Sequence, residues 1–176
     1  MIIFIARVVL GLATIVLIIA SNRQIFRRLP SGPQLSEMEL VYYVIGIAAV
    51  ALAWYFNARY VSQHSIGWEN PLSGKGSSTN YFKSMFANPA ASAASQGYLI
   101  ANLLLLPVYT IASGYRRAVR RPWLYFVASW FVGFAGAWAF YLATTHRRRR
   151  LVACSALELT NEWAVGKRPT TRFETE

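Results

Sequence analysis

Two clusters of arginine are the residues of this sequence best suited to chemistry with an anionic partner. The first, RRAVRRPW, holds four arginines within six residues, and the second, HRRRR, follows the next apolar stretch. The four arginines of the first cluster, the basic turn, are Arg116, Arg117, Arg120 and Arg121. Guanidinium groups bind phosphate and carboxylate oxygens. In a chain of net charge +11, the clusters therefore indicate nucleic acid, anionic lipid or a signal that fixes membrane topology.

The position of the basic turn decides among these three alternatives. The turn occupies only about nine residues between two apolar stretches, so no separate domain presents its arginines to a duplex. Proteins that follow a phosphate backbone spread their charge over an exposed face, and we therefore expect no nucleic-acid partner. Short loops rich in Lys and Arg stay on the cytoplasmic side of a membrane. We expect a topology signal, with contacts to anionic lipid head groups as an addition.

Residues that could carry catalysis or hold a cofactor are scarce. Asp is absent, every Glu lies outside the strongly apolar stretches, and Cys154 is the single cysteine. The two histidines, His64 and His146, follow the second and fourth apolar stretches, which alternating membrane crossings would place on opposite sides. A haem held by both is therefore excluded, and a zinc site lacks ligands. We expect no cofactor, no metal and no catalytic residues.

The elements that position the arginines are four apolar stretches. With 55% hydrophobic and 14% charged residues, the composition predicts an all-α polytopic membrane protein, a bundle of four transmembrane helices. The predicted spans are residues 2–20, 39–56, 92–113 and 123–145. Each rises far enough, at about 1.5 Å per residue, to cross the hydrocarbon layer. The first span has no basic segment before it, so we expect it to be retained rather than cleaved as a signal peptide.

Local capping signals fix the start of two predicted helices. Ser36 followed three residues later by Glu39 is typical of a capping box. Asn88 followed by Pro89 is typical of a helix that begins with proline at its first position. We expect one helix to begin directly after Ser36 and another to begin at Pro89.

Two residues inside the third span could make polar contacts in the membrane. Pro107 kinks the predicted helix and frees a carbonyl group. Asn102, about one turn earlier, is the most polar side chain in the middle of any span. We expect Asn102 to make a hydrogen bond between helices, and a ligand contact is the alternative.

The segments outside the spans are a long loop and a tail. Residues 57–88 form the longest connection, and an aromatic pattern near its end predicts a short interfacial helix. In the polar or amphipathic tail, residues 151–176, apolar residues at helical spacing form one face. They are Val152, Ala156, Leu159 and Trp163. This face is predicted to lie on the membrane surface as part of an amphipathic helix, and docking on a partner is the alternative.

The two arginine clusters flank the fourth predicted span and so cannot both be cytoplasmic in a bundle of four crossings. More positive charge follows the first span than precedes it, and the two shortest loops are both basic. These counts favour a topology in which both termini lie outside and the basic turn lies inside.

Three consecutive segments carry a resemblance to a known family. They are FKSMFANPAASA from Phe82 to Ala93, GYRRAVRRPWLYF and FVGFAGAWAFYL, which ends shortly before the second arginine cluster. Over roughly residues 40–148 the chain resembles a family of small bacterial integral membrane proteins that contain a domain of unknown function. The resemblance implies a helical fold in the bacterial inner membrane and no particular activity.

These observations favour a non-catalytic function. The leading hypothesis is an accessory, assembly or stabilising subunit of a larger bacterial membrane complex, with another membrane protein as its partner. The alternative is a carrier or binder of a lipid or other apolar ligand, with a crevice near Asn102 and Pro107 and the basic turn on the head group. An integral membrane enzyme is a third hypothesis.

Overall fold

The structure, a computed structural model, describes residues 2–29, 32–64 and 78–164, and all regular structure among them is helical. The elements are α1 (Ile2–Ser21), α2 (Arg23–Phe26), α3 (Glu37–His64), α4 (Ser78–Ser84), α5 (Pro89–Ile100), the π-helical turn η1 (Ala101–Leu105), α6 (Leu106–Arg116), α7 (Leu124–Val132) and α8 (Phe134–Ala164). The predicted all-α class is confirmed. Parts of the predicted long loop and tail, residues 65–77 and 165–176, lie outside the described residues.

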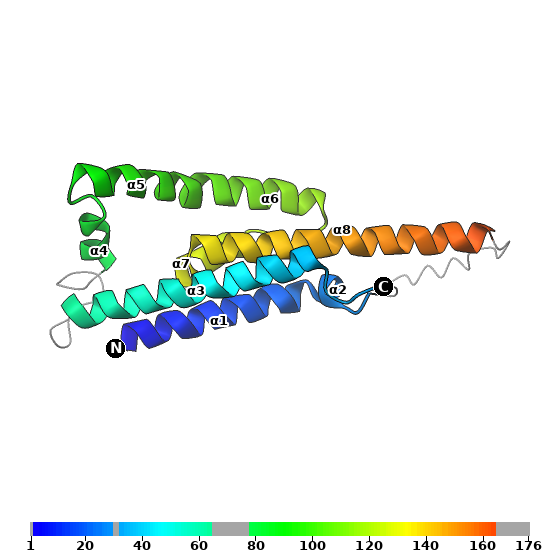
Figure 1. Ribbon diagram of the computed structural model, residues 1–176, viewed down its shortest axis with the longest axis horizontal. Helices are drawn as coiled ribbons and strands as arrows, with labels where there is room; N and C mark the ends of the chain where they lie inside the picture. Colours follow the sequence, from blue (N-terminus) through cyan, green and yellow to red (C-terminus); the bar gives the residue numbers. More distant parts are fainter. Residues whose placement is uncertain (1, 30–31, 65–77, 165–176) are drawn as a thin grey trace.

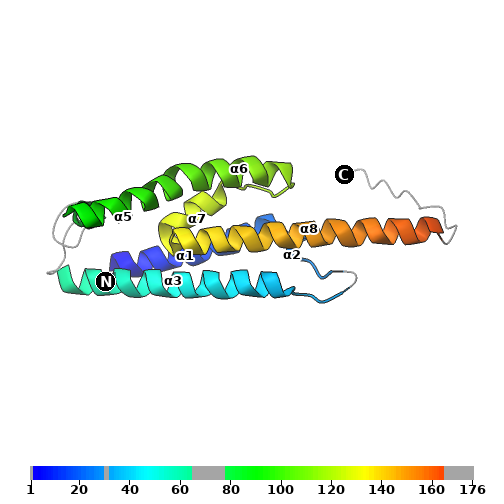
Figure 2. The ribbon, with the colours of Figure 1, turned by 45° about the horizontal axis from the view of Figure 1, so that its top comes forward.

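The long helices lie side by side along one axis (Figures 1 and 2). α3 packs mainly against α8, and α1 packs mainly against α7. α5, η1 and α6 follow one another as a single rod, which contacts the other helices mainly through α6 and η1. Two described helical segments, Glu37–Gln63 and Pro89–Arg116, are long and apolar enough to cross a membrane, and Ile5–Ser21 is apolar but shorter.

Both predicted helix starts are confirmed. The Glu39 amide donates to Ser36 Oγ at 3.2 Å, and the Ser36 amide donates to Glu39 Oε2 at 3.3 Å, which is the reciprocal pattern of a capping box. Asn88 Oδ1 accepts from the Ala91 amide at 2.8 Å, and Pro89 occupies the first turn of α5. α3 runs past the predicted end at residue 56 because residues 57–64 contain no Gly or Pro to interrupt the helix.

The predicted single helix over residues 123–145 is wrong, because the chain reverses at Gly133. The backbone there has φ 82° and ψ 156°, a conformation that is open almost only to glycine. Tyr125 of α7 donates to Thr144 Oγ1 of α8 at 2.8 Å, although the two residues are nineteen positions apart. In one continuous helix they would stand about 28 Å apart. α7 and α8 are therefore an antiparallel hairpin with Gly133 at its apex (Figure 2).

The reversal brings both arginine clusters to the same end of the bundle. α7 has nine residues, and α8 has thirteen residues before Arg147, so neither segment reaches across a hydrocarbon layer of about 30 Å. Arg148 Nε donates to the carbonyl oxygen of Arg117 at 3.3 Å, which joins the second cluster to the basic turn. The expectation that the clusters lie at opposite ends is wrong, and so is its consequence that α8 ends on the side opposite the basic turn.

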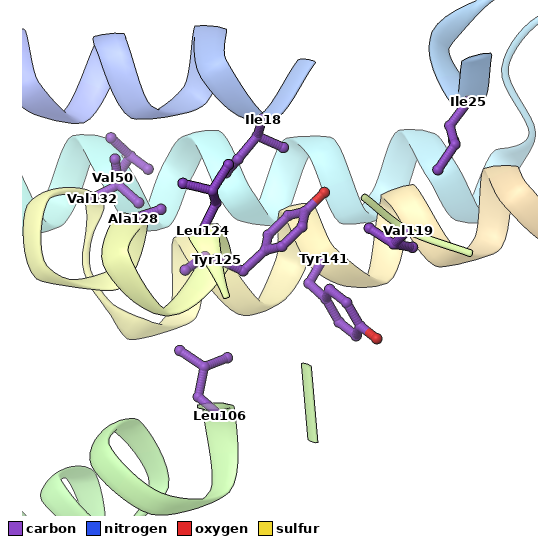
Figure 3. Packing of buried hydrophobic residues seen from close by; sticks show 11 residues of the cluster. Ile18, Ile25, Val50, Leu106, Val119, Leu124, Tyr125, Ala128, Val132 and Tyr141 are labelled. Atoms are coloured by element: carbon purple, nitrogen blue, oxygen red, sulfur yellow. The ribbon is translucent and has the colours of Figure 1, made fainter. Parts of the chain in front are cut away.

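The buried core gathers around this hairpin. Tyr125, Val132 and Tyr141 of the hairpin are fully buried, and Leu106 of α6 packs against them (Figure 3). Glycine allows α3 and α8 to approach closely, because a Cβ atom on Gly136 would lie 2.8 Å from Val50 Cγ2.

We expect Gly133→Ala to destabilise the protein, because an L-residue at this φ and ψ costs about 1–3 kcal/mol. The midpoint of thermal unfolding in detergent should fall by several degrees. Gly97→Ala is the control, since nothing lies within 4 Å of a Cβ atom built there. Equal midpoints for Gly133→Ala and the wild type would show that no tight reversal exists at Gly133.

Candidate functional site at the arginine-rich end of the bundle

Three segments distant in sequence meet at one end of the bundle, the arginine-rich end. It comprises residues 22–29 after α1, the basic turn with the start of α7, and the second arginine cluster in α8. The start of α3, with Glu39, closes the same end. The site is therefore made by tertiary contacts and not by any one segment.

Glu39 is the buried centre of this end. Its side chain is fully buried, and its Oε2 lies 3.0 Å from Arg150 Nη1 and 3.4 Å from Arg147 Nη1. A carboxylate taken out of water is costly unless cations and hydrogen bonds compensate it. Two guanidinium groups from α8 supply this compensation, so Glu39 fastens the start of α3 to α8.

Arg147 extends the same network to the backbone after α1. Its buried guanidinium donates to the carbonyl oxygens of Ile25 at 2.9 Å, Arg27 at 3.0 Å and Gln34 at 2.7 Å. Ile25 lies in the last turn of the short helix α2, whose carbonyls have no intrahelical donors, and Arg27 and Gln34 follow it before α3. Arg147 thus holds the connection in place, and four of its five N–H donors are used within the protein.

His146 of α8 lies beside this network, next to the start of α3. Its Nδ1 is 3.7 Å from Glu39 Oε1 and 3.4 Å from Ser36 Oγ. Glu39 Oε1 has no hydrogen-bond partner among the described residues, and the His146 ring lies close to it without forming one. His64 ends α3 at its other end, far from His146, whereas the sequence analysis placed it in the long loop after the second span.

The basic turn is held by Asn22, which the sequence analysis did not single out. The Asn22 side chain is 1% exposed, and its Nδ2 donates to the carbonyl oxygen of Arg120 at 3.0 Å. Asn22 Oδ1 accepts from the Arg120 amide at 2.8 Å. The side chains of Arg116, Arg120 and Arg121 remain exposed. The turn has a fixed backbone and outward-facing charges.

An open depression of about 480 Å³ lies on the basic turn. It is lined by Tyr115, Ala118, Val119, Arg120 and Arg121. Two of these residues, Ala118 with φ 52° and Arg121 with φ 53°, have left-handed backbone, which curls the chain around the depression. The lining surface is mostly apolar, and two of the lining residues, Arg120 and Arg121, are exposed cations, a combination suited to an amphiphilic anion.

Arg7 and Trp54 serve the apex of the hairpin at the other end of α7. Arg7 Nη2 and Nε donate to the carbonyl oxygen of Trp130 at 3.0 and 3.3 Å. Trp54 Nε1 donates to the carbonyl oxygen of Phe131 at 2.9 Å. Because α7 stops at Gly133, these carbonyls lose their intrahelical donors, and the two side chains replace them.

Asn102 and Pro107 do not form the predicted polar contact between helices. Asn102 is buried, its Nδ2 meets only the Tyr98 hydroxyl of the same rod at 3.5 Å, and its Oδ1 has no hydrogen-bond partner among the described residues. Pro107 lacks an amide hydrogen and cannot continue the α-helical hydrogen bonds. The rod accommodates it with the wider π-helical turn η1, in which the Leu106 amide donates to the carbonyl oxygen of Ala101. Neither residue lines the depression.

The predicted docking residues lie on the part of α8 beyond the second arginine cluster. Val152 and Leu159 are each 51% exposed, and Ala156 is exposed between them. The side chain of Trp163 lies outside the described residues, although α8 reaches Ala164. The structure therefore leaves the described part of this stripe uncovered.

A comparison with family models finds one match, over residues 41–147, to the family described as protein of unknown function DUF2834. The chain belongs to this family. The matched region runs from the first turns of α3 to Arg147, and it includes the rod, the basic turn and the hairpin, but not α1 or the tail. No curated protein and no solved structure matches the chain. Membership in a family of unknown function is what the sequence predicted.

We expect Arg147→Gln to be strongly destabilising, because it removes donors from three backbone carbonyls and one of the two cations that compensate Glu39. Breaking a buried ion pair costs about 3–5 kcal/mol. Arg149→Gln is the matched control, since it removes the same charge from an exposed neighbour on α8. Thermal unfolding in detergent measures both. Equal midpoints for the two variants would contradict a structural role for Arg147.

Proposed function

We propose that this protein is an integral membrane protein that acts without catalysis, as an accessory or stabilising subunit of a larger complex in the bacterial inner membrane. Its apolar exterior supports the membrane placement. Only 17% and 22% of the residues are buried in the most apolar windows of α3 and of the rod α5–α6. Soluble proteins rarely expose such large contiguous apolar surfaces, whereas lipid hydrocarbon covers them at no cost.

In this placement α1, α3 and the rod cross the membrane, and the α7–α8 hairpin enters and leaves on the side of the arginine-rich end. Donors from Arg7 and Trp54 support such a hairpin, because backbone carbonyls inside a bilayer need partners within the protein. The positive-inside rule places the arginine-rich end in the cytoplasm. The N-terminus then lies outside and the end of α8 lies inside.

The observation that carries the subunit proposal is the length of α8. The helix continues for fourteen residues past Arg150, about 21 Å at the usual rise. It stays roughly parallel to α3 in both views, so its end points away from the bundle (Figures 1 and 2). If Arg147 to Arg150 lie at the head groups, this extension stands in water, where lipid does not cover its apolar residues.

The apolar stripe on this extension fits one partner helix. Val152, Ala156, Leu159 and Trp163 follow one another at intervals of four, three and four residues. Apolar residues at alternating intervals of three and four form the seam of a pair of helices. We therefore infer that a helical segment of another membrane protein packs on this stripe. The alternative, an apolar ligand near Asn102 and Pro107, would occupy a different place from the depression, which neither residue lines.

Substitutions on the stripe test the docking. The tagged full-length protein is purified from membranes of its native host in mild detergent, and co-eluting proteins are quantified. We expect a stoichiometric partner with the wild type and its loss with Val152→Glu/Leu159→Glu, because the seam would have to bury two carboxylates.

Leu157→Glu is the control for this experiment. Leu157 is 63% exposed but lies about 140° around the helix from Val152, so the partner should remain. Equal retention of the partner by the double variant would refute docking on the stripe. The absence of any stoichiometric partner from the wild type would refute the subunit proposal.

Cysteine labelling tests the orientation in a Cys154→Ala background. Arg59→Cys and Ser155→Cys place exposed thiols near opposite ends of the bundle. In right-side-out spheroplasts, we expect a membrane-impermeant maleimide to label position 59 at once and position 155 only after permeabilisation. The reverse pattern would contradict the orientation, and recovery of the protein without detergent would contradict membrane placement.

A further inference from the structure

We propose that the depression on the basic turn binds the phosphate-containing head group of an anionic phospholipid. The inference rests on the membrane placement proposed above but not on the docking of a partner. It assigns a ligand class to Arg120 and Arg121 and a place on α6 to the acyl chains.

The positive charge of the basic turn is not compensated by carboxylates among the described residues. Among the described residues, every ion pair converges on Glu39, and its partners come from the second arginine cluster and His146. No carboxylate in the described part of the chain pairs with Arg116, Arg120 or Arg121, whose side chains are exposed. The electrostatic potential at the turn is therefore strongly positive, and an anion is the ligand that it favours.

The backbone of the basic turn is held in place without a ligand. Asn22 holds the Arg120 backbone through both its amide and its carbonyl group. Arg148 donates to the carbonyl oxygen of Arg117, and Val119 is 2% exposed beneath the turn. A head group arriving there needs to order only the arginine side chains, which lowers the entropic cost of binding.

The residues that line the depression suit a phosphate-containing head group. The depression is open to the outside and has a volume of about 480 Å³. Arg120 and Arg121 each present a planar guanidinium group, which can donate two parallel hydrogen bonds to a phosphate group. Tyr115, which is 62% exposed, supplies apolar contact beside them.

An apolar strip on α6 indicates a lipid rather than a free phosphate ion. Val108, Ile111 and Tyr115 are exposed at intervals of three and four residues, so they share one face of the helix. The strip leads from the interior of the proposed membrane to the depression at its edge. A free anion would use the two arginines alone, whereas a phospholipid would also cover the strip with its acyl chains.

The test is a titration of the purified full-length protein in detergent micelles with phosphatidylglycerol, phosphatidylcholine or inorganic phosphate. The rise in the midpoint of thermal unfolding gives an apparent Kd for each ligand. We expect the wild type to prefer phosphatidylglycerol. Arg120→Gln/Arg121→Gln should weaken this binding roughly thirtyfold, since each cation contributes about a fivefold factor toward anionic lipid.

Arg27→Gln/Arg28→Gln is the matched control, because it removes two exposed charges from the same end outside the depression. We expect this variant to keep the preference for phosphatidylglycerol. Equal weakening by both double variants would overturn the site in favour of general attraction. Stabilisation by inorganic phosphate to the same extent would overturn the lipid as its ligand.

The wild type provides a second measurement, should Arg120→Gln/Arg121→Gln fail to fold. Added salt should reduce the stabilisation by phosphatidylglycerol and leave that by phosphatidylcholine unchanged, because exposed charge pairs are screened. Equal salt dependence would overturn the proposal. If the wild type requires detergent for extraction but shows no preference for phosphatidylglycerol, the head-group site alone is refuted. A protein extracted without detergent refutes the membrane placement as well.

Discussion

The C-terminal carbonyl groups of α7 need hydrogen-bond donors inside the bundle, and the rest of the structure depends on where those donors come from. Arg7 of α1 and Trp54 of α3 supply them, at the oxygens of Trp130 and Phe131. These contacts let the helix stop at Gly133 without leaving the two carbonyl oxygens unpaired. They also join α1 and α3 to the hairpin, so the same contacts cap α7 and hold the helices of the bundle together.

The reversal at Gly133 changes what the arginines do. In a continuous helix the two clusters would lie on opposite faces of a membrane and would send conflicting topology signals. In the hairpin they lie together, with Arg148 bonded to the backbone of Arg117. The two clusters then have different roles. Arg147 and Arg150 compensate the charge of Glu39 and bind backbone carbonyls, whereas the exposed arginines of the basic turn point outward. This division separates a structural network from a surface that can bind anions.

Features decided within a few residues could be predicted from the sequence, and features decided by distant contacts could not. Ser36 with Glu39, and Asn88 with Pro89, fix helix starts through bonds that span three residues. Gly133 stands among other small residues in FVGFAGA, where a packing glycine and a reversal have the same pattern. The bond from Arg7 to Trp130 joins residues 123 positions apart, and that from Arg147 to Glu39 joins residues 108 positions apart. No local signal marks such pairs, although an arginine inside an apolar stretch does indicate that a polar partner is needed.

The distance between the two arginine clusters distinguishes a hairpin that reverses at Gly133 from one continuous helix. Spin labels at Arg116→Cys and Arg149→Cys, both at exposed positions in a Cys154→Ala background, allow that distance to be measured by double electron–electron resonance in lipid nanodiscs. A hairpin that reverses at Gly133 predicts a label separation well below the ~30 Å thickness of the hydrocarbon layer. A separation of about 30 Å or more would mean that residues 123–145 cross the membrane as one helix, and it would contradict the account.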